Sequence, residues 1–478
     1  MLYQIYENQR AWMAPFVNAA HLSYVFLTNP ASPLSFLPLA RRAAAGFELL
    51  YRIGKQYEKP KFEIGSVLVV NRAVPVTREI AINKPFCHLL HFRKDWADAG
   101  MAPVAQPKVL LLAPLSGHHA TLLRDTVETL LSDHDVYITD WIDAKMVPVE
   151  EGAFHLHDYI HYIQEFIRHL GPDVHVMAVC QPSVPLLGAV SLMSTAGDPK
   201  LPRSMIMMGG PIDTRRSPTQ VDDLATGRDI KWFERNLIHT VPANYPGAGR
   251  KVYPGFLQHM GFVAMNPQRH AKSYGEFYEH LARHGKDAVT EHHRRFYDEY
   301  NAVLDMPAEF YLETVKVVFQ ETRLANGTWE VEGKPVRPKD ITKVALLTIE
   351  GEWDDITGRG QTKAAHDLCS AIPKDMKEHY IAPQAGHYGI FSGRRWHERV
   401  CPKIGAFILA HSAPRGDKQA KAHKARPART ASAAKPVAPS AAKPARPGKT
   451  AGRAGKPVPA GIPGSGKTAS RKAARRAA

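Results

Sequence analysis

The stretch Asp173-Val-His-Val-Met-Ala-Val-Cys-Gln-Pro-Ser-Val-Pro-Leu-Leu-Gly188 ends an apolar run at a side chain that can act as a nucleophile. Val174–Val179 predicts a buried strand, and Cys180 lies where that strand turns into a helix. This layout is typical of a nucleophile elbow, which exposes the reactive atom and points the next backbone N–H at a developing oxyanion. Cysteine stands in the usual place of serine, and Ala178 and Pro182 stand in the usual places of glycine.

The rest of the chain supplies more strands of the same kind. From about residue 59, short β-rich runs alternate with segments of helical periodicity. Strands that alternate with amphipathic helices indicate an α/β protein with a mostly parallel sheet covered on both faces. The expected strands are Ile64–Val70, Lys108–Ala113, Val136–Thr139, Val174–Val179, Met205–Met208, Val344–Ile349 and His379–Ile381.

Two segments flank or interrupt this alternation. Residues 1–58 predict an N-terminal helical segment, broken at Pro30 and Pro33, and residues 59–412 form the expected catalytic domain. Within it, residues 214–341 are rich in aromatic side chains and histidines and have mainly helical character. We expect this insertion to form a cap over the carboxyl edge of the sheet. The alternative is a helical excursion with no role at the site.

The charge of the chain is concentrated at its end. Residues 414–478 carry 17 lysines and arginines and a single acidic residue, Asp417, so this tail accounts for the whole formal charge of +16. Residues 413–478 lack aromatic side chains, which predicts disorder. Non-specific binding to DNA, binding to an anionic granule or lipid surface, and a purely solubilising role remain open for this tail. The motif Gly461–Thr468 matches a phosphate loop in letters, but it lacks the flanking strand and helix that such a loop needs.

Cysteine usage and hydropathy bear on the compartment. The four cysteines (Cys87, Cys180, Cys369 and Cys401) show no paired spacing, which favours a reducing environment. We expect no secretory signal, because the first ten residues lack a basic segment followed by an apolar one. We expect no transmembrane segment, because no uncharged apolar stretch is long enough. The sequence therefore predicts a cytoplasmic protein.

Two further residues follow predicted strands in an order that suits catalysis. Asp354 comes soon after Val344–Ile349, and His387 comes soon after the last strand. Nucleophile, then acid, then histidine is the chain order of the α/β-hydrolase fold. We therefore expect Cys180, Asp354 and His387 to form a catalytic triad. Asp355 is the alternative acid.

Each residue type has a chemical reason to be there. An imidazole beside a thiol supplies thiolate near neutral pH, and a carboxylate on the far ring nitrogen fixes the tautomer. The oxyanion hole is expected to use the N–H of Gln181 and one from the loop after the strand Lys108–Ala113. Leu115 and Ser116 are both candidates for that second donor.

Several segments together resemble the intracellular polyhydroxybutyrate depolymerases, over roughly residues 1–410. They are Pro85-Phe-Cys-His-Leu-Leu-His-Phe, Pro114-Leu-Ser-Gly-His-His, Val179-Cys-Gln-Pro, Met208-Gly-Gly-Pro-Ile-Asp and Gly386-His-Tyr-Gly. The resemblance implies an α/β-hydrolase fold with Cys180 as nucleophile and Asp354 and His387 as its partners. It also implies ester cleavage in native, amorphous polyester granules in the cytoplasm. The acyl group would pass to water or to coenzyme A.

Two other functions fit the same residues. A polyhydroxyalkanoate synthase-like acyltransferase also uses Cys, Asp and His on this fold, although synthases keep glycines around the nucleophile. A non-catalytic protein that tethers granules to the nucleoid through residues 413–478 is the third possibility. No resident cofactor and no metal site are expected. His157 and His161 have the spacing of zinc ligands, but helical periodicity places them on the exposed side with Gln164 and Arg168.

Overall fold

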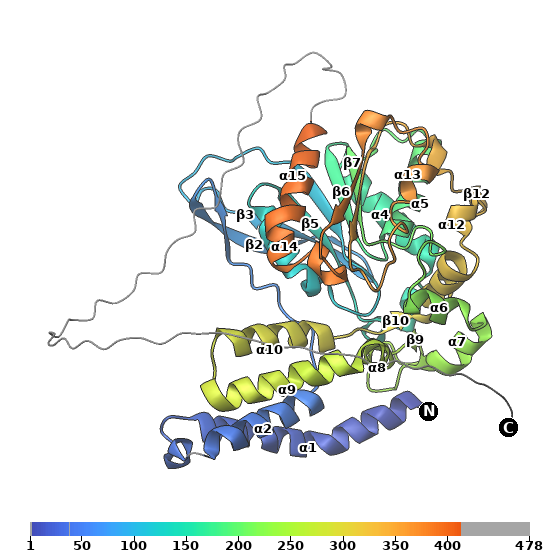
Figure 1. Cartoon of the computed structure of the whole chain (residues 1–478). Coiled ribbons are helices and arrows are strands. Elements are labelled where there is room, and N and C mark those ends of the chain that lie inside the picture. The colour runs from blue at the N-terminus through green and yellow to red at the C-terminus, as the bar shows by residue number, and fades with distance from the viewer. Residues whose placement is uncertain (1, 38, 413–478) are drawn as a thin grey trace, which may run out of the picture. The chain divides into compact units, whose positions relative to one another are not determined.

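The computed structural model describes residues 2–37 and 39–412 and is built around a nine-stranded sheet (Figure 1). Its strand order is β1-β2-β3-β5-β4-β6-β7-β13-β14. The strands from β5 to β14 run parallel, whereas β1, β2 and β3 pair antiparallel. The bounds are β1 Ser66–Val69, β2 Arg72–Asn83, β3 Cys87–Lys94, β4 Lys108–Leu112, β5 Asp135–Trp141, β6 Val174–Val179, β7 Ser204–Met208, β13 Ala345–Gly351 and β14 Lys377–Ala382.

The seven predicted strands are all present, and the sheet contains two that the sequence did not reveal. These are β2 and β3, which extend the sheet on its antiparallel side. Most side chains of β2 are exposed, and charged residues interrupt it. It therefore lacks the continuous apolar run that marks a buried strand in a sequence.

Helices cover both faces of the parallel part of the sheet. Every side chain of β6 and β7 is buried, and because successive side chains point to opposite faces, both faces must be covered. The covering helices include α4 (Leu156–Leu170) and α5 (Ser183–Thr195), which pack against each other, and α3 (Arg124–Leu131) and α15 (Cys401–Ala410) (Figure 1). This arrangement, with reactive loops after β6, β13 and β14, is the α/β-hydrolase fold.

Helix α4 corrects one sequence expectation. Ile160, Ile163 and Ile167 are buried, as their spacing predicts. Gln164 was expected on the exposed side, but its side chain is buried and its Nε2 donates to the carbonyl oxygen of Ala189 in α5. The buried face of α4 is therefore wider than its apolar stripe, because α5 offers a polar backbone partner.

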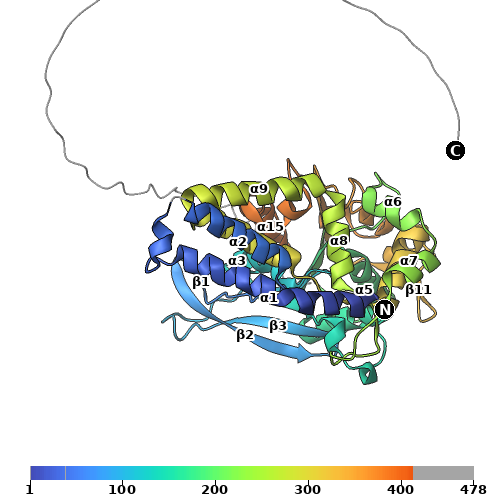
Figure 2. The same ribbon diagram turned by 90° about the horizontal axis from the view of Figure 1, so that it is seen from below.

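The chain between β7 and β13 is mainly helical and carries short strands. Its elements are α6 Gln220–Thr226, α7 Ile230–Leu237, β8 His239–Thr240, β9 Lys251–Tyr253, α8 Gly255–Met265, α9 Pro267–His284, α10 Ala288–Asn301, β10 Met306–Pro307, α11 Ala308–Thr314, α12 Arg323–Asn326, β11 Glu330–Val331 and β12 Lys334–Pro335. Helices α8, α9 and α10 lie apart from the sheet, next to the N-terminal helices (Figures 1 and 2).

The N-terminal segment forms two helices, α1 (Leu2–Thr28) and α2 (Ala40–Gly54), which pack against each other and onto α9 (Figure 2). A buried guanidinium anchors α2 to α10: Arg52 lies 2.9 Å from Asp298 and donates to the carbonyl oxygen of Arg294. At the start of α1, the Tyr3 hydroxyl donates to Asp305 at 2.6 Å. The first 58 residues thus pack directly on the inserted helices.

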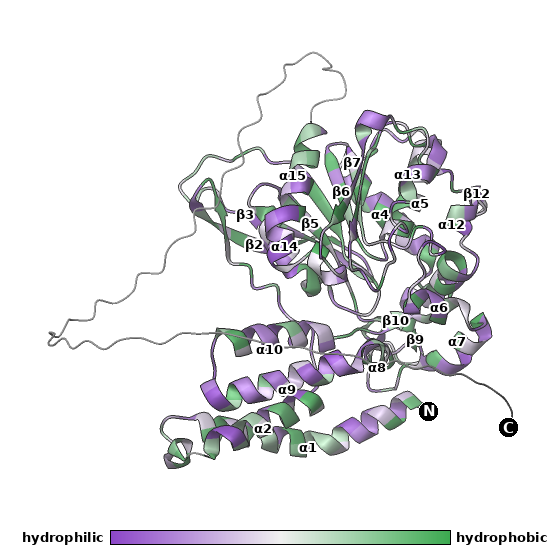
Figure 3. Cartoon of the chain, viewed as in Figure 1, coloured by the Kyte–Doolittle hydropathy of each residue, from purple (hydrophilic) through white to green (hydrophobic). Residues whose placement is uncertain are grey.

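Helix α1 contains apolar residues, seen as green stretches in Figure 3, and several of their side chains are exposed. Its exposed side chains include Trp12 (68% exposed), Phe16 (61%) and Leu22 (67%). The charged residues of α1 are Glu7 and Arg10, and they pair with each other at 2.6 Å. In the described part of the chain, no helix has both the length and the apolarity to cross a bilayer.

The basic tail, residues 413–478, lies outside the described residues. Its expected disorder, its expected surface binding and the discounted phosphate-loop motif remain predictions from the sequence.

Candidate active site

Cys180 occupies a sharp turn between β6 and α5. Its φ is +67°, a left-handed conformation that a non-glycine residue rarely adopts and that costs on the order of 1 kcal/mol. The backbone on both sides holds this conformation. The Cys180 N–H donates to the Met208 carbonyl at 2.7 Å, and its own carbonyl accepts from the Ser183 N–H at 3.1 Å. The side chain is half-buried, so the thiol lies at the end of the sheet with partial access to solvent.

Two glycines after β7 allow the site to close up around this turn. A Cβ on Gly209 would lie 3.1 Å from Cε1 of His387 and 3.3 Å from Oδ2 of Asp354. A Cβ on Gly210 would lie 2.2 Å from the side chain of Ser183, in the first turn of α5. Close approach therefore requires glycine at position 210, and Gly209 combines tight contacts with a left-handed backbone, φ +57°, which together give a physical reason for the Met208-Gly-Gly-Pro segment.

The structure brings His387 and Asp354 together. Nδ1 of His387 lies 2.8 Å from Oδ2 of Asp354, and both side chains are buried. Oδ1 of Asp354 accepts from the backbone N–H groups of Ile356 and Thr357 at 3.0 and 2.9 Å. The carboxylate is thus held on one oxygen by its own loop and presents the other to the imidazole. Asp355, the alternative acid, is exposed.

Charge on two neighbours governs the protonation of His387. Burial alone would lower the pKa of its imidazole, but the Asp354 carboxylate, which is hydrogen-bonded to the ring, and the neighbouring Cys180 sulfur raise that pKa well above 6.5. An imidazole that contacts a carboxylate on one side and a thiol on the other is the arrangement in which it can take and return the thiol proton.

This raised pKa predicts how stability depends on pH. Since the folded-state pKa of His387 exceeds its unfolded value, its contribution is complete below about pH 6.5 and is lost as pH rises through the folded pKa. The free energy of unfolding of the wild type, minus that of His387→Gln, should therefore shrink as pH rises above about 6.5 and through the raised pKa of His387. Urea unfolding at a series of pH values measures it. A difference that stays constant or grows with pH contradicts the assignment.

The three predicted oxyanion donors lie together, but they are not equivalent. The Leu115 N–H makes a long contact, 3.4 Å, to Oε1 of Gln181, which ties the loop after β4 to the elbow. Among the described residues, neither the Gln181 N–H nor the Ser116 N–H has a hydrogen-bond acceptor. These two free N–H groups favour Gln181 and Ser116 as the oxyanion donors. The Leu115 N–H would instead hold the loop after β4 against Gln181.

The inserted helices contact the site through aromatic side chains that the sequence analysis did not single out. Phe296 and Tyr300 of α10 have ring centroids 6.4 Å from that of Tyr388, which follows His387 in the chain. The His118 ring stacks on Phe262 of α8 at 4.8 Å and lies 5.4 Å from the Tyr300 ring. The spacing in Phe296-Tyr-Asp-Glu-Tyr300 does place the rings of Phe296 and Tyr300 on one face of α10. The contact of that face with Tyr388 depends on how the insertion folds back, which the sequence does not reveal.

The loop after β4 is also fixed by the insertion. The Leu304 N–H donates to the Gly117 carbonyl at 2.7 Å, and His118 Nε2 lies 3.2 Å from the Tyr300 carbonyl oxygen. Gly117 has a φ of +109°, and a Cβ there would lie 2.5 Å from Oε1 of Gln258. Burial lowers the pKa of His118 to about 4, so this ring stays neutral near neutral pH and acts as packing.

Comparison with known proteins finds similarity to one protein family and to curated relatives. Residues 209–412 match the family described as PHB de-polymerase C-terminus, a segment that contains Asp354 and His387. Two curated relatives are poly(3-hydroxyalkanoate) polymerase subunits PhaC. The one from Haloferax mediterranei is 23% identical over 62% of this chain, and the one from Haloarcula marismortui is 21% identical over 60%. The matches span 56% and 57% of the relatives' own lengths, little more than half.

Solved structures similar to this chain include two hydrolases. A thermophilic esterase from Thermogutta terrifontis has a TM-score of 0.38 and 12% identity, over 71% of this chain and 99% of its own. A 2-hydroxy-6-oxo-6-phenylhexa-2,4-dienoate hydrolase from Rhodococcus has a TM-score of 0.38 and 13% identity, with the same coverage of 71% and 99%.

Proposed function

We propose that this chain cleaves the ester bonds of amorphous poly(3-hydroxybutyrate), with Cys180 as the nucleophile. The observation that carries the proposal is the position of His387, which is hydrogen-bonded to Asp354 and neighbours a cysteine held in an elbow. A cysteine thiol next to such a histidine can attack an acyl carbon. The similar family and relatives are named for polyhydroxyalkanoates, so we take an aliphatic polyester as the acyl substrate.

The proposed reaction has two halves. Sγ of Cys180 bonds to the ester carbonyl carbon while His387 holds the thiol proton, and the N–H groups of Gln181 and Ser116 stabilise the oxyanion. The C–O bond then breaks, the proton passes to the leaving hydroxyl, and a 3-hydroxyacyl thioester remains on Cys180. Water, deprotonated by His387, attacks that thioester and restores the thiol. The thiol of coenzyme A is the alternative acceptor, since exchange between thioesters is nearly isoenergetic.

The polymer is insoluble, so the enzyme must meet it at a surface. We place that contact on the exposed apolar side chains of α1, Trp12, Phe16 and Leu22 among them. The charged residues of α1 neutralise each other, so this face suits an uncharged polyester better than an anionic lipid surface. In this proposal the protein works in the cytoplasm, associated with polyester granules.

The second candidate function is polymer synthesis, and the two curated relatives favour it. A synthase would load Cys180 from a 3-hydroxyacyl-CoA and pass the acyl group to a growing chain, which is the thiolytic reaction in reverse. The elbow argues against synthesis, because synthases keep glycines around the nucleophile. Here Ala178, which is fully buried, and Pro182, in the turn directly before α5, stand in those places. A non-catalytic tethering protein is the third candidate. It would leave Cys180, with its left-handed backbone and its position beside His387, without a role.

Two substrates separate these functions. The full-length chain is incubated with amorphous granules, with and without coenzyme A, and separately with 3-hydroxybutyryl-CoA. We expect 3-hydroxybutyrate, its oligomers or 3-hydroxybutyryl-CoA from granules, and no polymer from the thioester. Polymer from the thioester would establish the synthase, and no product from either substrate would favour the tether.

A further inference from the structure

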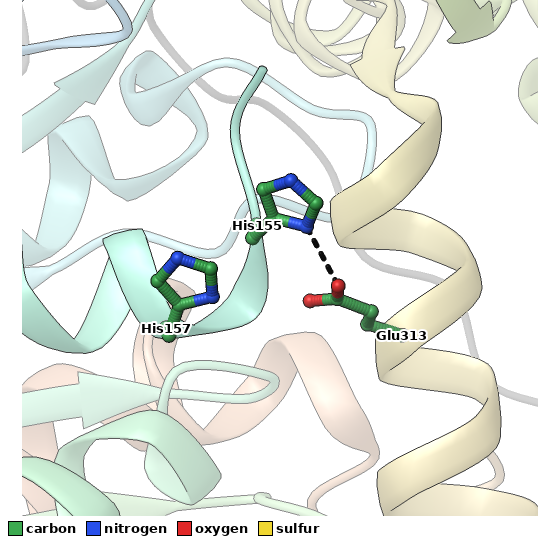
Figure 4. A group of neighbouring side chains, drawn as sticks. All are labelled: His155, His157 and Glu313. Carbon is green, nitrogen blue, oxygen red and sulfur yellow. Dashed lines mark hydrogen bonds and ion pairs between the residues drawn. The ribbon is translucent and has the colours of Figure 1, made fainter. Parts of the chain in front are cut away.

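A second group of chemically capable side chains lies outside the Cys180 site. His155 and His157 stand at the start of α4, and Glu313 lies on α11, 158 residues further along from His155 (Figure 4). One ligand-capable atom from each of the three lies within 4.8 Å of the others. All three side chains are about one-third exposed, so an ion could reach them from solvent.

The contacts within the group suit a metal ion. Nδ1 of His155 lies 2.6 Å from Oε1 of Glu313, a distance that a shared proton accounts for. The other oxygen of Glu313 accepts from the Leu156 N–H at 2.8 Å, which fixes the carboxylate against the start of α4. A divalent ion can take the place of that proton if the two ligand atoms move apart slightly, which partly exposed side chains permit.

His157 lies beside this pair, and one of its ring nitrogens faces the side on which Glu313 lies (Figure 4). Oδ2 of Asp158 accepts from the His155 N–H at 2.8 Å and lies 3.7 Å from Nε2 of His157, so its negative charge is close to the histidines without a hydrogen bond to the His157 ring. The two carboxylates, Asp158 and Glu313, also offset the positive end of the α4 dipole, which would otherwise disfavour a cation.

We propose that His155, His157 and Glu313 bind a divalent transition-metal ion, with Zn²⁺ as the best fit. Two imidazoles and one carboxylate form a recognised zinc ligand set, and water would complete the coordination. The bound ion would cross-link α4, the helix that leads into β6, to α11, the first helix after the aromatic helices α8 to α10. This site is independent of the proposed polyester chemistry.

Isothermal titration of Zn²⁺ into the full-length chain tests the proposal. All proteins carry Cys180→Ala, so that the thiol takes no metal, and are first stripped with a chelator. The parent should bind a single ion at the site, and His157→Ala or Glu313→Gln should weaken that binding by roughly 100-fold. Glu313→Gln keeps an acceptor for the Leu156 N–H, so it tests ligation rather than folding.

His161→Ala is the matched control, since His161 lies one turn further along α4 and contacts Glu332 instead. It should bind Zn²⁺ like the parent. Equal losses in His161→Ala and His157→Ala would overturn the site in favour of a pair on α4 alone. Unchanged binding in Glu313→Gln, or no binding by the parent, would also overturn it. Replacing Zn²⁺ by Co²⁺ adds a second readout, because the visible absorption of bound Co²⁺ should disappear in His155→Ala.

Discussion

Replacing Cys180 with alanine should abolish product release from granules, with a loss in rate on the order of 10⁵-fold or more. The loss is expected to be this large because, in the proposed mechanism, the sulfur forms the covalent intermediate and no other described side chain in the elbow can replace it. The fold should survive, since Cys180 is only half-buried and alanine tolerates its backbone little worse than cysteine does. Initial rates with amorphous granules measure the effect, and thermal unfolding checks the fold.

The matched control is Cys401→Ala. Cys401 is the other half-buried cysteine among the described residues, and burial raises the pKa of its thiol to about 12, which makes it a poor nucleophile. We expect this variant to keep its activity. In the wild type, mass spectrometry after brief exposure to substrate should find a 3-hydroxyacyl group on Cys180. Full activity in Cys180→Ala, or an adduct on Cys401 alone, would contradict the nucleophile assignment.

The sequence was sufficient for the parts of this molecule that rest on local pattern. Four of the seven runs, β4, β6, β7 and β13, are parallel strands with almost every side chain buried, so their apolar character marks them in the sequence. The run assigned to β1 was expected to be buried, but β1 is an antiparallel strand that exposes alternate side chains. The candidate catalytic residues were chosen because they follow predicted strands. Cys180, Asp354 and His387 follow β6, β13 and β14. In the sheet β7 lies between β6 and β13, and β14 pairs with β13, so the carboxyl ends of these parallel strands lie at the same edge. Chain order was therefore enough to predict that these residues lie at one edge of the sheet, where His387 and Asp354 are hydrogen-bonded.

Other features depend on contacts that no local pattern carries. Glu313 is unremarkable in the sequence, and it acquires a partner only because α11 packs beside α4. Tyr388 meets Phe296 and Tyr300 for the same kind of reason. Strand β2 was missed because its exposed, charged side chains hide the alternation, and Gln164 was misplaced because its partner is a backbone carbonyl of another helix.

The choice between Asp354 and Asp355 is a case where the geometry adds what the sequence left open. The two carboxylates are adjacent in the chain, and the sequence favours Asp354 only through its distance from the end of the strand. In the structure, the exposed fraction of the Asp354 side chain is 1% and its Oδ2 meets His387, whereas Asp355 is exposed. The difference comes from the turn after Asp354, whose N–H groups from Ile356 and Thr357 capture Oδ1.

Asp354→Asn should therefore reduce the rate on granules by on the order of 10⁴-fold, while Asp355→Asn should change it by no more than about twofold. Asparagine keeps an oxygen for the Ile356 and Thr357 N–H groups, so the loop should hold its shape. Its amide nitrogen would then face Nδ1 of His387, which favours the tautomer that carries its proton on Nε2. In that tautomer the imidazole has no lone pair with which to take the thiol proton. Unfolding curves that match the wild type, together with the rate loss, would separate this effect from misfolding. A large loss in Asp355→Asn with an active Asp354→Asn would instead assign the acid to Asp355.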